Sequence, residues 1–494
     1  MSSSEKTCLN MALVAKAVNP GWGRAAAADG TSATELAAFA RVFNRSWAIA
    51  ALFDKAWYDH WVYSPSNFIL AFAALVLFIR PGCAACLITF CVAQTCDYFS
   101  ESKVMANHPW IMVLVDTMLL VTAVRFACRG EWSADVLAKI FHEVLPAIRV
   151  SVLIVYLWAT FHKLNTDFLN PDTSCVSLLM YGFNHRPLLF SFYHPPTWQV
   201  LAGIHGTLVV EALIPLLLSF RRTRAAGILL AVAFHSFLSF GIRNGFYAFS
   251  VVIFPLLMSF VSPSWAARLD AWVVRLAWPH SERWWGWLIR AMAALTLGLL
   301  SIFSNRLGIS RVCPAWFTYN ALILTFILFD LWRHGVRSLP VIEPRPFRLA
   351  GLGLVTLVVI IFLNGACPYL GLKTENSFAM YSNLRTEGNR PNHLIVPGWF
   401  SIFPGQEDLV EVFDCSVPQI RELSRQGLLL PHFQLCSEMT NYPEASIVFR
   451  HQQQVYSVTR VADRPDLLPS IPLWKRRLFP FRPVEPYGPQ GCRH

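Results

Sequence analysis

The sequence has few charged residues for its length. Only 14% of its 494 residues are Asp, Glu, Lys or Arg, whereas 55% are hydrophobic and the mean hydropathy is +0.43. A soluble chain of this size needs more charge to cover its surface and does not contain repeated long apolar runs. The composition therefore excludes an ordinary soluble domain and predicts a polytopic membrane protein.

Acidic residues are scarcer than basic ones, which gives a formal net charge of +11. The Lys and Arg residues fall in short clusters between apolar runs, where the positive-inside rule places them in a membrane protein. A concentrated basic surface for nucleic acid is lacking. The expected partner is therefore the lipid bilayer, and no nucleic acid is expected.

Three further features are missing from the sequence. Residues 1–45 lack the continuous apolar stretch of a cleavable signal and are expected to form a poorly ordered N-terminal tail. Internal repeats and discontinuous helices, which are typical of transporters, are not evident. The C-x-x-C motif at Cys83 and Cys86 has no second pair of ligands, so these residues are interpreted as helix packing and no metal site is predicted.

Apolar runs, some shorter than the ~20 residues that span a bilayer, recur through residues 46–370. They predict an all-α membrane bundle of about nine to eleven helices. The expected spans are 68–79, 83–96, 110–124, 146–161, 198–220, 225–240, 246–261, 288–303, 315–331 and 349–368. Residues 46–63 remain ambiguous, because Asp54, Lys55, Asp59 and His60 interrupt them. They either enter the membrane or lie flat on it.

The loops between these runs predict an orientation. Alternate loops are rich in arginine, as at Arg221, Arg222 and Arg224, and should face the cytoplasm. The opposite set of loops then contains His108 and Lys163. On this reading, both residues and the whole chain after residue 368 lie on the extracytoplasmic face of the cell membrane.

The composition becomes polar after residue 370 and predicts a small extracytoplasmic α+β domain over residues 371–494. Strands are expected at 393–396, 409–415 and 446–458, and an amphipathic helix at 417–430. The Pro- and Arg-rich end, "LFPFRPVEPYGPQGCRH", is expected to be flexible. A disulfide between Cys415 and Cys436 is one option in an oxidising compartment, although spacing does not establish the pairing.

Ionisable residues lie within or beside several of the apolar runs. Taken one at a time, a lysine can snorkel to the interface, a glutamate can pair with an arginine, and a histidine can bind a backbone carbonyl. Taken together, groups on separate helices predict a polar cavity, because each alone is costly in lipid. The candidates are Asn107, His108, Lys163, His205, Glu211 and His235.

The segment "RVSVLIVYLWATFHKLNTDFL" resembles the core of vitamin K-dependent gamma-carboxylases, in which an Arg near the helix start precedes a Lys-Leu-x-x-Asp-aromatic motif. "ANHPW" resembles their Asn-Asn-His segment, with Ala106 replacing the first Asn. "HGTLVVEALIPLLLSF" aligns with the next span, and "KTENSFAMYSNLRTEG" is similar to the stretch after the last span. The resemblance, closer to bacterial horizontally transferred transmembrane (HTTM) proteins, covers roughly residues 46–440.

The resemblance implies an enzyme that couples oxygenation of a reduced quinone, either vitamin K hydroquinone or menaquinol, to carboxylation of Glu side chains. Lys163 would deprotonate the hydroquinone, and reaction with O2 would produce a stronger base that removes the γ-proton of Glu before CO2 adds. His108 would act at the carbanion and CO2. The quinone would bind near the remaining candidates, and a Glu-containing protein or peptide would be the acceptor. The remaining candidates are Asn107, His205, Glu211 and His235.

Two alternatives stay open at this point. The compact C-terminal part departs from the large lumenal region with which animal carboxylases grip their substrate. The same scaffold could therefore carry another quinone- or lipid-linked reaction, or serve as a non-catalytic membrane binding or assembly protein. Loss of Lys163 should leave a binding protein unaffected.

Overall fold

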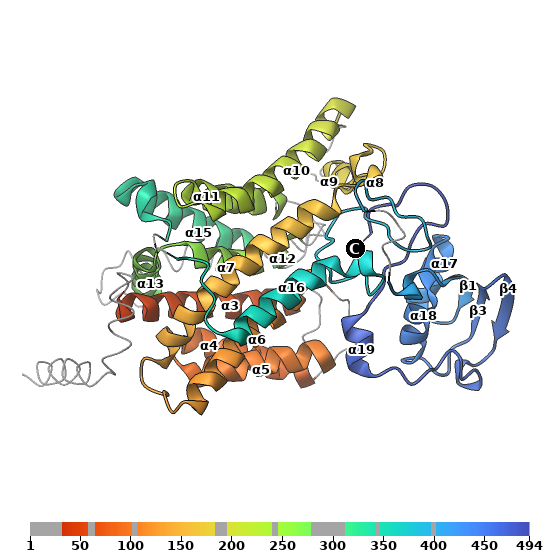
Figure 1. The fold of residues 1–494 in the computed structure, drawn as a ribbon, viewed down its shortest axis with the longest axis horizontal. Helices are drawn as coiled ribbons and strands as arrows, with labels where there is room; N and C mark the ends of the chain where they lie inside the picture. Colours follow the sequence, from red (N-terminus) through yellow and green to blue (C-terminus); the bar gives the residue numbers. More distant parts are fainter. Residues whose placement is uncertain are drawn as a thin grey trace, which may run out of the picture.

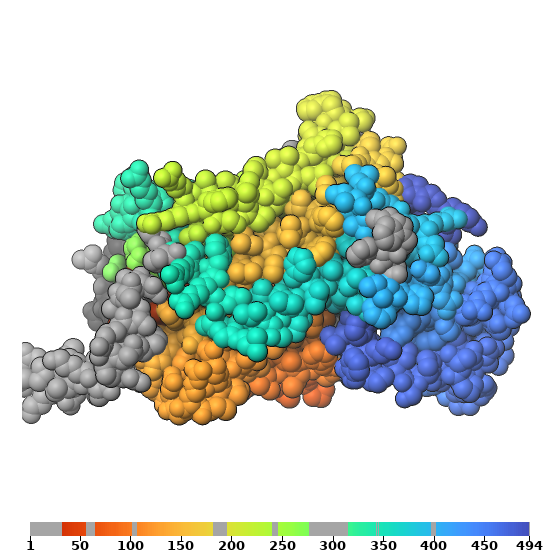
Figure 2. Space-filling model, viewed as in Figure 1, coloured from red at the N-terminus to blue at the C-terminus, as the bar shows by residue number. Residues whose placement is uncertain are grey.

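The computed structural model describes residues 32–57, 65–100, 106–182, 195–239, 246–277, 312–341, 343, 345–396 and 402–493. These residues form a mostly helical protein with a small antiparallel sheet near the C-terminus (Figure 1). In the space-filling view, the blue C-terminal residues cover one end of the helical part (Figure 2). The helices and the sheet are therefore in contact rather than separated by an extended linker.

Five described helices are long and apolar enough to cross a membrane: α6 (Asn107–Cys128), α7 (Val136–His162), α10 (Thr197–Ser219), α15 (Val312–His334) and α16 (Leu352–Leu370). Four shorter apolar helices accompany them: α4 (Pro65–Ile79), α5 (Ala84–Ser100), α11 (Arg224–Ser239) and α12 (Phe246–Leu257). The chain therefore has the helices of a multi-pass membrane protein. The expected span 288–303 lies outside the described residues, so the count of nine to eleven stays a prediction.

Helix α3 (Ala33–Trp57) begins inside the segment that was expected to be a poorly ordered tail. Phe39, Phe43 and Trp47 recur every four residues, so they share one face of the helix, and all three are fully buried. This face packs against α7, where the Phe43 and Phe141 rings meet edge to face. The helix begins this early because its apolar face is buried. The sequence just before this face is rich in Ala and Gly, and this composition obscured the pattern.

Charged side chains of α3 are paired inside the protein rather than directed to lipid. Arg41 and Arg45 both bind Asp270 of α13 (Pro263–Ala277), and Lys55 binds Asp97 of α5. Pairing removes much of the cost of placing such charges among apolar helices. It explains how a segment interrupted by charges can pack at the centre of the bundle.

Helices α7 and α16 run side by side and approach closely (Figure 1). A Cβ atom at Gly365 of α16 would lie 2.1 Å from Cδ1 of Trp158 on α7. The absence of a side chain at Gly365 therefore allows the indole to pack against the α16 backbone. This contact fixes the two helices next to the position of Lys163.

The sheet has the strand order β2-β1-β3-β4 and is antiparallel throughout. Its strands are β1 (Leu409–Cys415), β2 (Leu429–Pro431), β3 (Ile447–His451) and β4 (Gln454–Val458). The short helices around it are α17 (Pro418–Arg425), α18 (His432–Met439) and α19 (Leu473–Leu478). Four 3-10 turns complete the described elements: Met258–Phe260, Val336–Ser338, Pro404–Gln406 and Val461–Asp463.

The strand expected at 409–415 is confirmed, and the single strand expected at 446–458 is divided into β3 and β4 by a turn at Gln452 and Gln453, whose φ angles are positive. Two other expectations are wrong. The helix expected to reach residue 430 ends at Arg425, because Gly427 adopts a left-handed φ of 67° and the chain then pairs as β2. The strand expected at 393–396 is reduced to one bridge between His393 and Asn165. Gly427 was a local signal for the helix end that the expectation overlooked, whereas the bridge depends on Asn165, a distant partner that local propensity cannot reveal.

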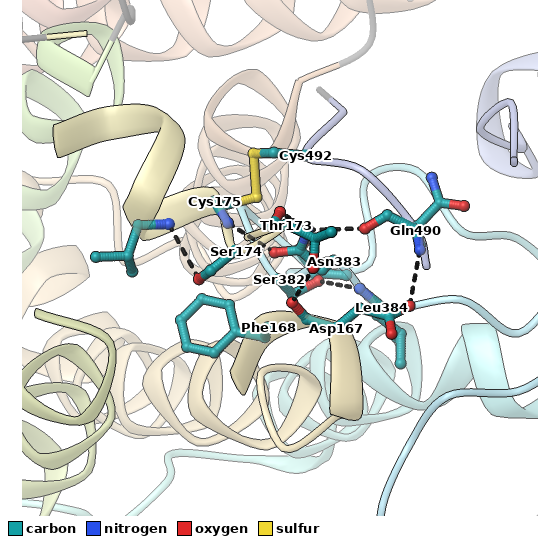
Figure 3. Close-up of a disulfide and its surroundings, with 12 residues drawn as sticks. Asp167, Phe168, Thr173, Ser174, Cys175, Ser382, Asn383, Leu384, Gln490 and Cys492 are labelled. Carbon is teal, nitrogen blue, oxygen red and sulfur yellow. Dashed lines mark hydrogen bonds between the residues drawn. A yellow bond between two sulfur atoms is a disulfide. The ribbon is translucent and has the colours of Figure 1, made fainter. Parts of the chain in front are cut away.

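The C-terminal end is anchored, in contrast to the expected flexible tail. Cys492 forms a disulfide with Cys175, the first residue of α9 (Cys175–Gly182), and Gln490 binds Asp167 and Asn383 (Figure 3). Cys415 and Cys436 are free thiols, so the bridge considered between them does not form. Cys175 and Cys492 are 317 residues apart in the sequence, and composition does not reveal a pairing across such a separation.

Replacing Gly365 by Ala should destabilise the bundle by about 1–3 kcal/mol, because the new methyl group collides with the Trp158 ring. Gly206→Ala is the matched control, since Gly206 is also helical and has nothing within 4 Å of the added Cβ. Thermal unfolding of the two variants in the same detergent measures the difference. Equal melting temperatures for both variants would show that α7 and α16 are not in this contact.

Candidate functional site

A buried ion pair lies where α7 ends. Lys163 follows the last residue of α7 and is 4% exposed, and its Nζ donates a hydrogen bond to the Ala159 carbonyl at 3.1 Å. The same nitrogen lies 3.1 Å from Oε1 and 2.9 Å from Oε2 of Glu211, on α10. The ammonium also lies 6.0 Å from the centre of the Phe168 ring. Lys163 is therefore held by a carboxylate and does not snorkel away from the bundle.

Tyr156 connects this pair to His235. It precedes Lys163 by seven residues, which places both on one face of α7, and it lies within electrostatic reach of Glu211. Its hydroxyl is 2.7 Å from Nε2 of His235 on α11. Among the described residues, Nδ1 of His235 is buried without a hydrogen-bond partner. We call Tyr156, Lys163, Glu211 and His235 the lysine site.

The structure does not bring His205 into this site. His205 is exposed on α10, six residues before Glu211, and this spacing rotates it by about 120° around the helix axis. Two polar residues on one helix thus point in different directions. His205 and Glu211 were grouped from the sequence because both belong to one apolar run. The face of the helix on which each residue lies was not considered.

His108 and Asn107 lie at the start of α6. Nε2 of His108 is 2.7 Å from Oδ1 of Asp54 on α3, and His108 is 6% exposed. The Asn107 side chain accepts a hydrogen bond from the Phe378 backbone N–H at 2.7 Å. Asp54, which made residues 46–63 hard to assign, thus orients His108.

Residues 373–386, which we call the post-membrane segment, connect these two places. Nε2 of His162, the neighbour of Lys163, lies 3.1 Å from the Ser377 carbonyl, and Asn107, the neighbour of His108, binds Phe378. Adjacent residues of one segment are therefore held by the neighbours of both candidate catalytic residues. Phe378 itself is fully buried in the core of the bundle.

The backbone of the post-membrane segment adopts an uncommon conformation. Positive φ angles between 48° and 65° occur at Asn376, Phe378, Tyr381 and Asn383. Such angles are costly for residues with side chains and persist where surrounding contacts determine them, often near functional sites. Here the side chains of Asn107 and Asn364 supply such contacts.

A second buried lysine was missed by the sequence analysis. Lys373 is 3% exposed, and its ammonium lies 5.2 Å from the centre of the Trp110 ring. Burial lowers the pKa of Lys373 to about 8. Its position just after an apolar run, like that of Lys163, was the signal that could have identified it.

A polar cleft of about 510 Å³ lies beside α8 (Thr166–Leu169), the short helix that follows Lys163. Arg385 and Arg390 supply positive charge to its lining, and Asp167 and Asn392 are hydrogen-bonded to each other at 2.7 Å. Burial lowers the pKa of Arg385, which nevertheless remains charged. The cleft therefore has the charge and the size to receive a carboxylate-bearing side chain.

The geometry thus defines a multi-pass membrane protein with a buried lysine site and an arginine-lined cleft at the same end. Residues 52–265 match the family model of the HTTM domain, and this range contains His108, Lys163, Glu211 and His235. This part of the chain is therefore similar to the HTTM domain, and its apolar helices are those of a multi-pass membrane protein. No curated protein and no solved structure matches the chain.

Glu211→Gln should destabilise the protein by about 3–5 kcal/mol, because it leaves the Lys163 ammonium buried without its counter-charge. Adding Lys163→Met to Glu211→Gln should restore much of this loss, since no buried charge then remains. His205→Ala, on the same helix but exposed, should change stability by less than about 0.5 kcal/mol.

Thermal unfolding of these variants in one detergent provides the measurement. A Glu211→Gln protein as stable as His205→Ala would contradict the buried pair.

Proposed function

We propose that this protein is a membrane enzyme that couples oxygenation of a reduced quinone to carboxylation of Glu side chains, with Lys163 as the general base. The observation that carries the proposal is the buried Lys163–Glu211 pair beside Tyr156 and His235. The HTTM domain around it supports the same reading.

The pair supplies a way for a buried lysine to act as a base. A charged ammonium cannot accept a proton, so Lys163 must first release one. Glu211 lies 2.9 Å away and can take that proton, and the transfer leaves the net charge of the pair unchanged. A neutral amine then remains among apolar helices, in the state that general base catalysis requires.

The residues around the lysine site fit a hydroxyl-bearing apolar ligand. The unpartnered Nδ1 of His235 offers a hydrogen-bonding position. The Phe234 and Phe249 rings, each with its centroid 5.5 Å from that of the His235 ring, supply apolar surface beside this position. When bound, the reduced quinone supplies, with O2, the stronger base that removes the γ-proton of Glu.

A small apolar cavity among α6, α7, α12 and α16 is not the quinone site. Its volume is about 10 Å³, which is the space of a single water molecule. Its lining includes Phe378 and Ile111 and contains one hydroxyl, that of Ser151. The proposal therefore assigns the quinone to the lysine site.

The acceptor Glu would bind in the arginine-lined cleft. Arg385 and Arg390 complement a carboxylate there, and α8 links the cleft directly to Lys163. His108, oriented by Asp54, would act at the carbanion and CO2.

The proposed orientation places the lysine site, the cleft and the C-terminal domain outside the cytoplasm. Arginine-rich loops such as residues 221–224 favour the cytoplasm for the opposite end. The Cys175–Cys492 disulfide supports the same assignment, because such bonds persist in oxidising compartments.

Protein isolated without reductant should gain two reactive thiols on reduction, counted by the mass added by a maleimide-polyethylene glycol reagent after denaturation. The reason is that Cys175 and Cys492 would be oxidised in the cell. Cys492→Ser should instead leave Cys175 reactive without reduction. Equal labelling of wild-type protein before and after reduction would contradict the extracytoplasmic orientation.

Lys163→Arg should reduce quinone oxidation by about 10²- to 10⁴-fold, the usual contribution of a positioned general base. Arginine keeps the positive charge opposite Glu211 but does not lose its proton in a protein. The measurement is the rate of reduced menaquinone oxidation by the purified protein in lipid nanodiscs.

Lys139→Arg is the matched control, because Lys139 lies on α7 and is also a buried lysine paired with a carboxylate, that of Asp135. It should retain most of the activity. Full quinone oxidation by a well-folded Lys163→Arg protein would remove Lys163 as the base and favour a structural ion pair, as expected of a non-catalytic membrane binding protein.

A further inference from the structure

Three strand ends meet at one edge of the C-terminal sheet. Asp408 precedes β1, His432 follows β2, and His451 is the last residue of β3. Because β1 is antiparallel to both neighbours, its start lies beside the ends of β2 and β3. The backbone N–H of His432 also donates to the Asp408 carbonyl at 2.8 Å. The fold therefore brings these three side chains together.

Both imidazoles are directed toward one carboxylate. Nε2 of His451 lies 2.6 Å from Oδ1 of Asp408, and Nδ1 of His432 lies 3.8 Å from Oδ2. The two rings stack with centroids 4.4 Å apart and planes 9° from parallel. One donor atom from each residue lies within 4.8 Å of the others. Donors around a tetrahedral Zn²⁺ are about 3.3 Å apart at ordinary bond lengths, so small side-chain movements would close this set around an ion.

The second nitrogen of His432 also has a neighbour. Its Nε2 lies 3.6 Å from Sγ of Cys436, one turn along α18. A histidine that binds metal through one nitrogen commonly donates a hydrogen bond from the other, which fixes the ring. A Cys-His-Asp nucleophile system is disfavoured, because Cys436 is 2% exposed and the His432–Asp408 separation exceeds a hydrogen bond.

We propose that Asp408, His432 and His451 bind one divalent transition-metal ion of the zinc class. Two imidazoles and a carboxylate suit Zn²⁺ and leave a fourth position for water or an external anion. The Asp408 side chain is 43% exposed, so the position can be reached from solvent. The ion would also link the start of β1 to the ends of β2 and β3.

Isothermal titration of Zn²⁺ into the full-length protein in detergent, after treatment with a chelator, tests this assignment. One ion should bind per chain, and His432→Ala with His451→Ala should weaken binding by on the order of 100-fold or more. His334→Ala is the matched control, because it removes a half-exposed histidine on α15 that also lies near an aspartate. Equal affinity in the wild type and the double variant would overturn the proposal.

Co²⁺ titration of the wild-type protein tests the donor set even if the variants fold poorly. Binding through nitrogen and oxygen should produce ligand-field absorption that saturates at one equivalent, without sulfur-to-metal charge-transfer bands. Charge-transfer bands would assign the ion to cysteines and contradict this site. Absence of saturable absorption, together with no Zn²⁺ binding, would also contradict it.

Discussion

Burial of the Lys163 ammonium is the constraint on which the site depends. An unpaired charge at this depth would be very costly, so Glu211 must lie opposite it. This requirement fixes the rotation of α10 relative to α7 and sends His205, on another face of α10, away from the site. The same pair also supplies a proton donor and acceptor in contact. Lys163 and Glu211 therefore both stabilise the packing of the two helices and can exchange a proton.

The post-membrane segment turns separate helix ends into one enclosed region. Its backbone is held by Asn107 and His162, the neighbours of His108 and Lys163, while Phe378 inserts into the bundle. The uncommon φ angles of the segment are tolerated because these contacts determine them. The C-terminal residues join this region through the Cys175–Cys492 disulfide and through the hydrogen bond that the Asn383 side chain donates to the Gln490 carbonyl. Residues that follow α16 thus contribute contacts to the neighbours of Lys163 and His108.

The sequence predicted the features that depend on local pattern. Apolar runs indicated the helices, and a lysine at the end of one run indicated where to look. Features that depend on distant partners were missed or wrong: the anchored tail, the pairing of Cys175, and the meeting of Asp408 with two histidines at the sheet edge. Tyr156 could be predicted only in part. Its seven-residue spacing from Lys163 was visible, but its partner His235 could be assigned only from the packing of α11.

The central claim is that the lysine site drives carboxylation. The most direct measurement incubates the purified protein in nanodiscs with reduced menaquinone or vitamin K, O2, isotopically labelled bicarbonate and a Glu-containing peptide. Our account predicts label in the peptide as γ-carboxyglutamate, formed only when both the reduced quinone and O2 are present. Quinone oxidation without label in any Glu peptide would contradict carboxylation, and the absence of both would contradict a quinone-linked enzyme altogether.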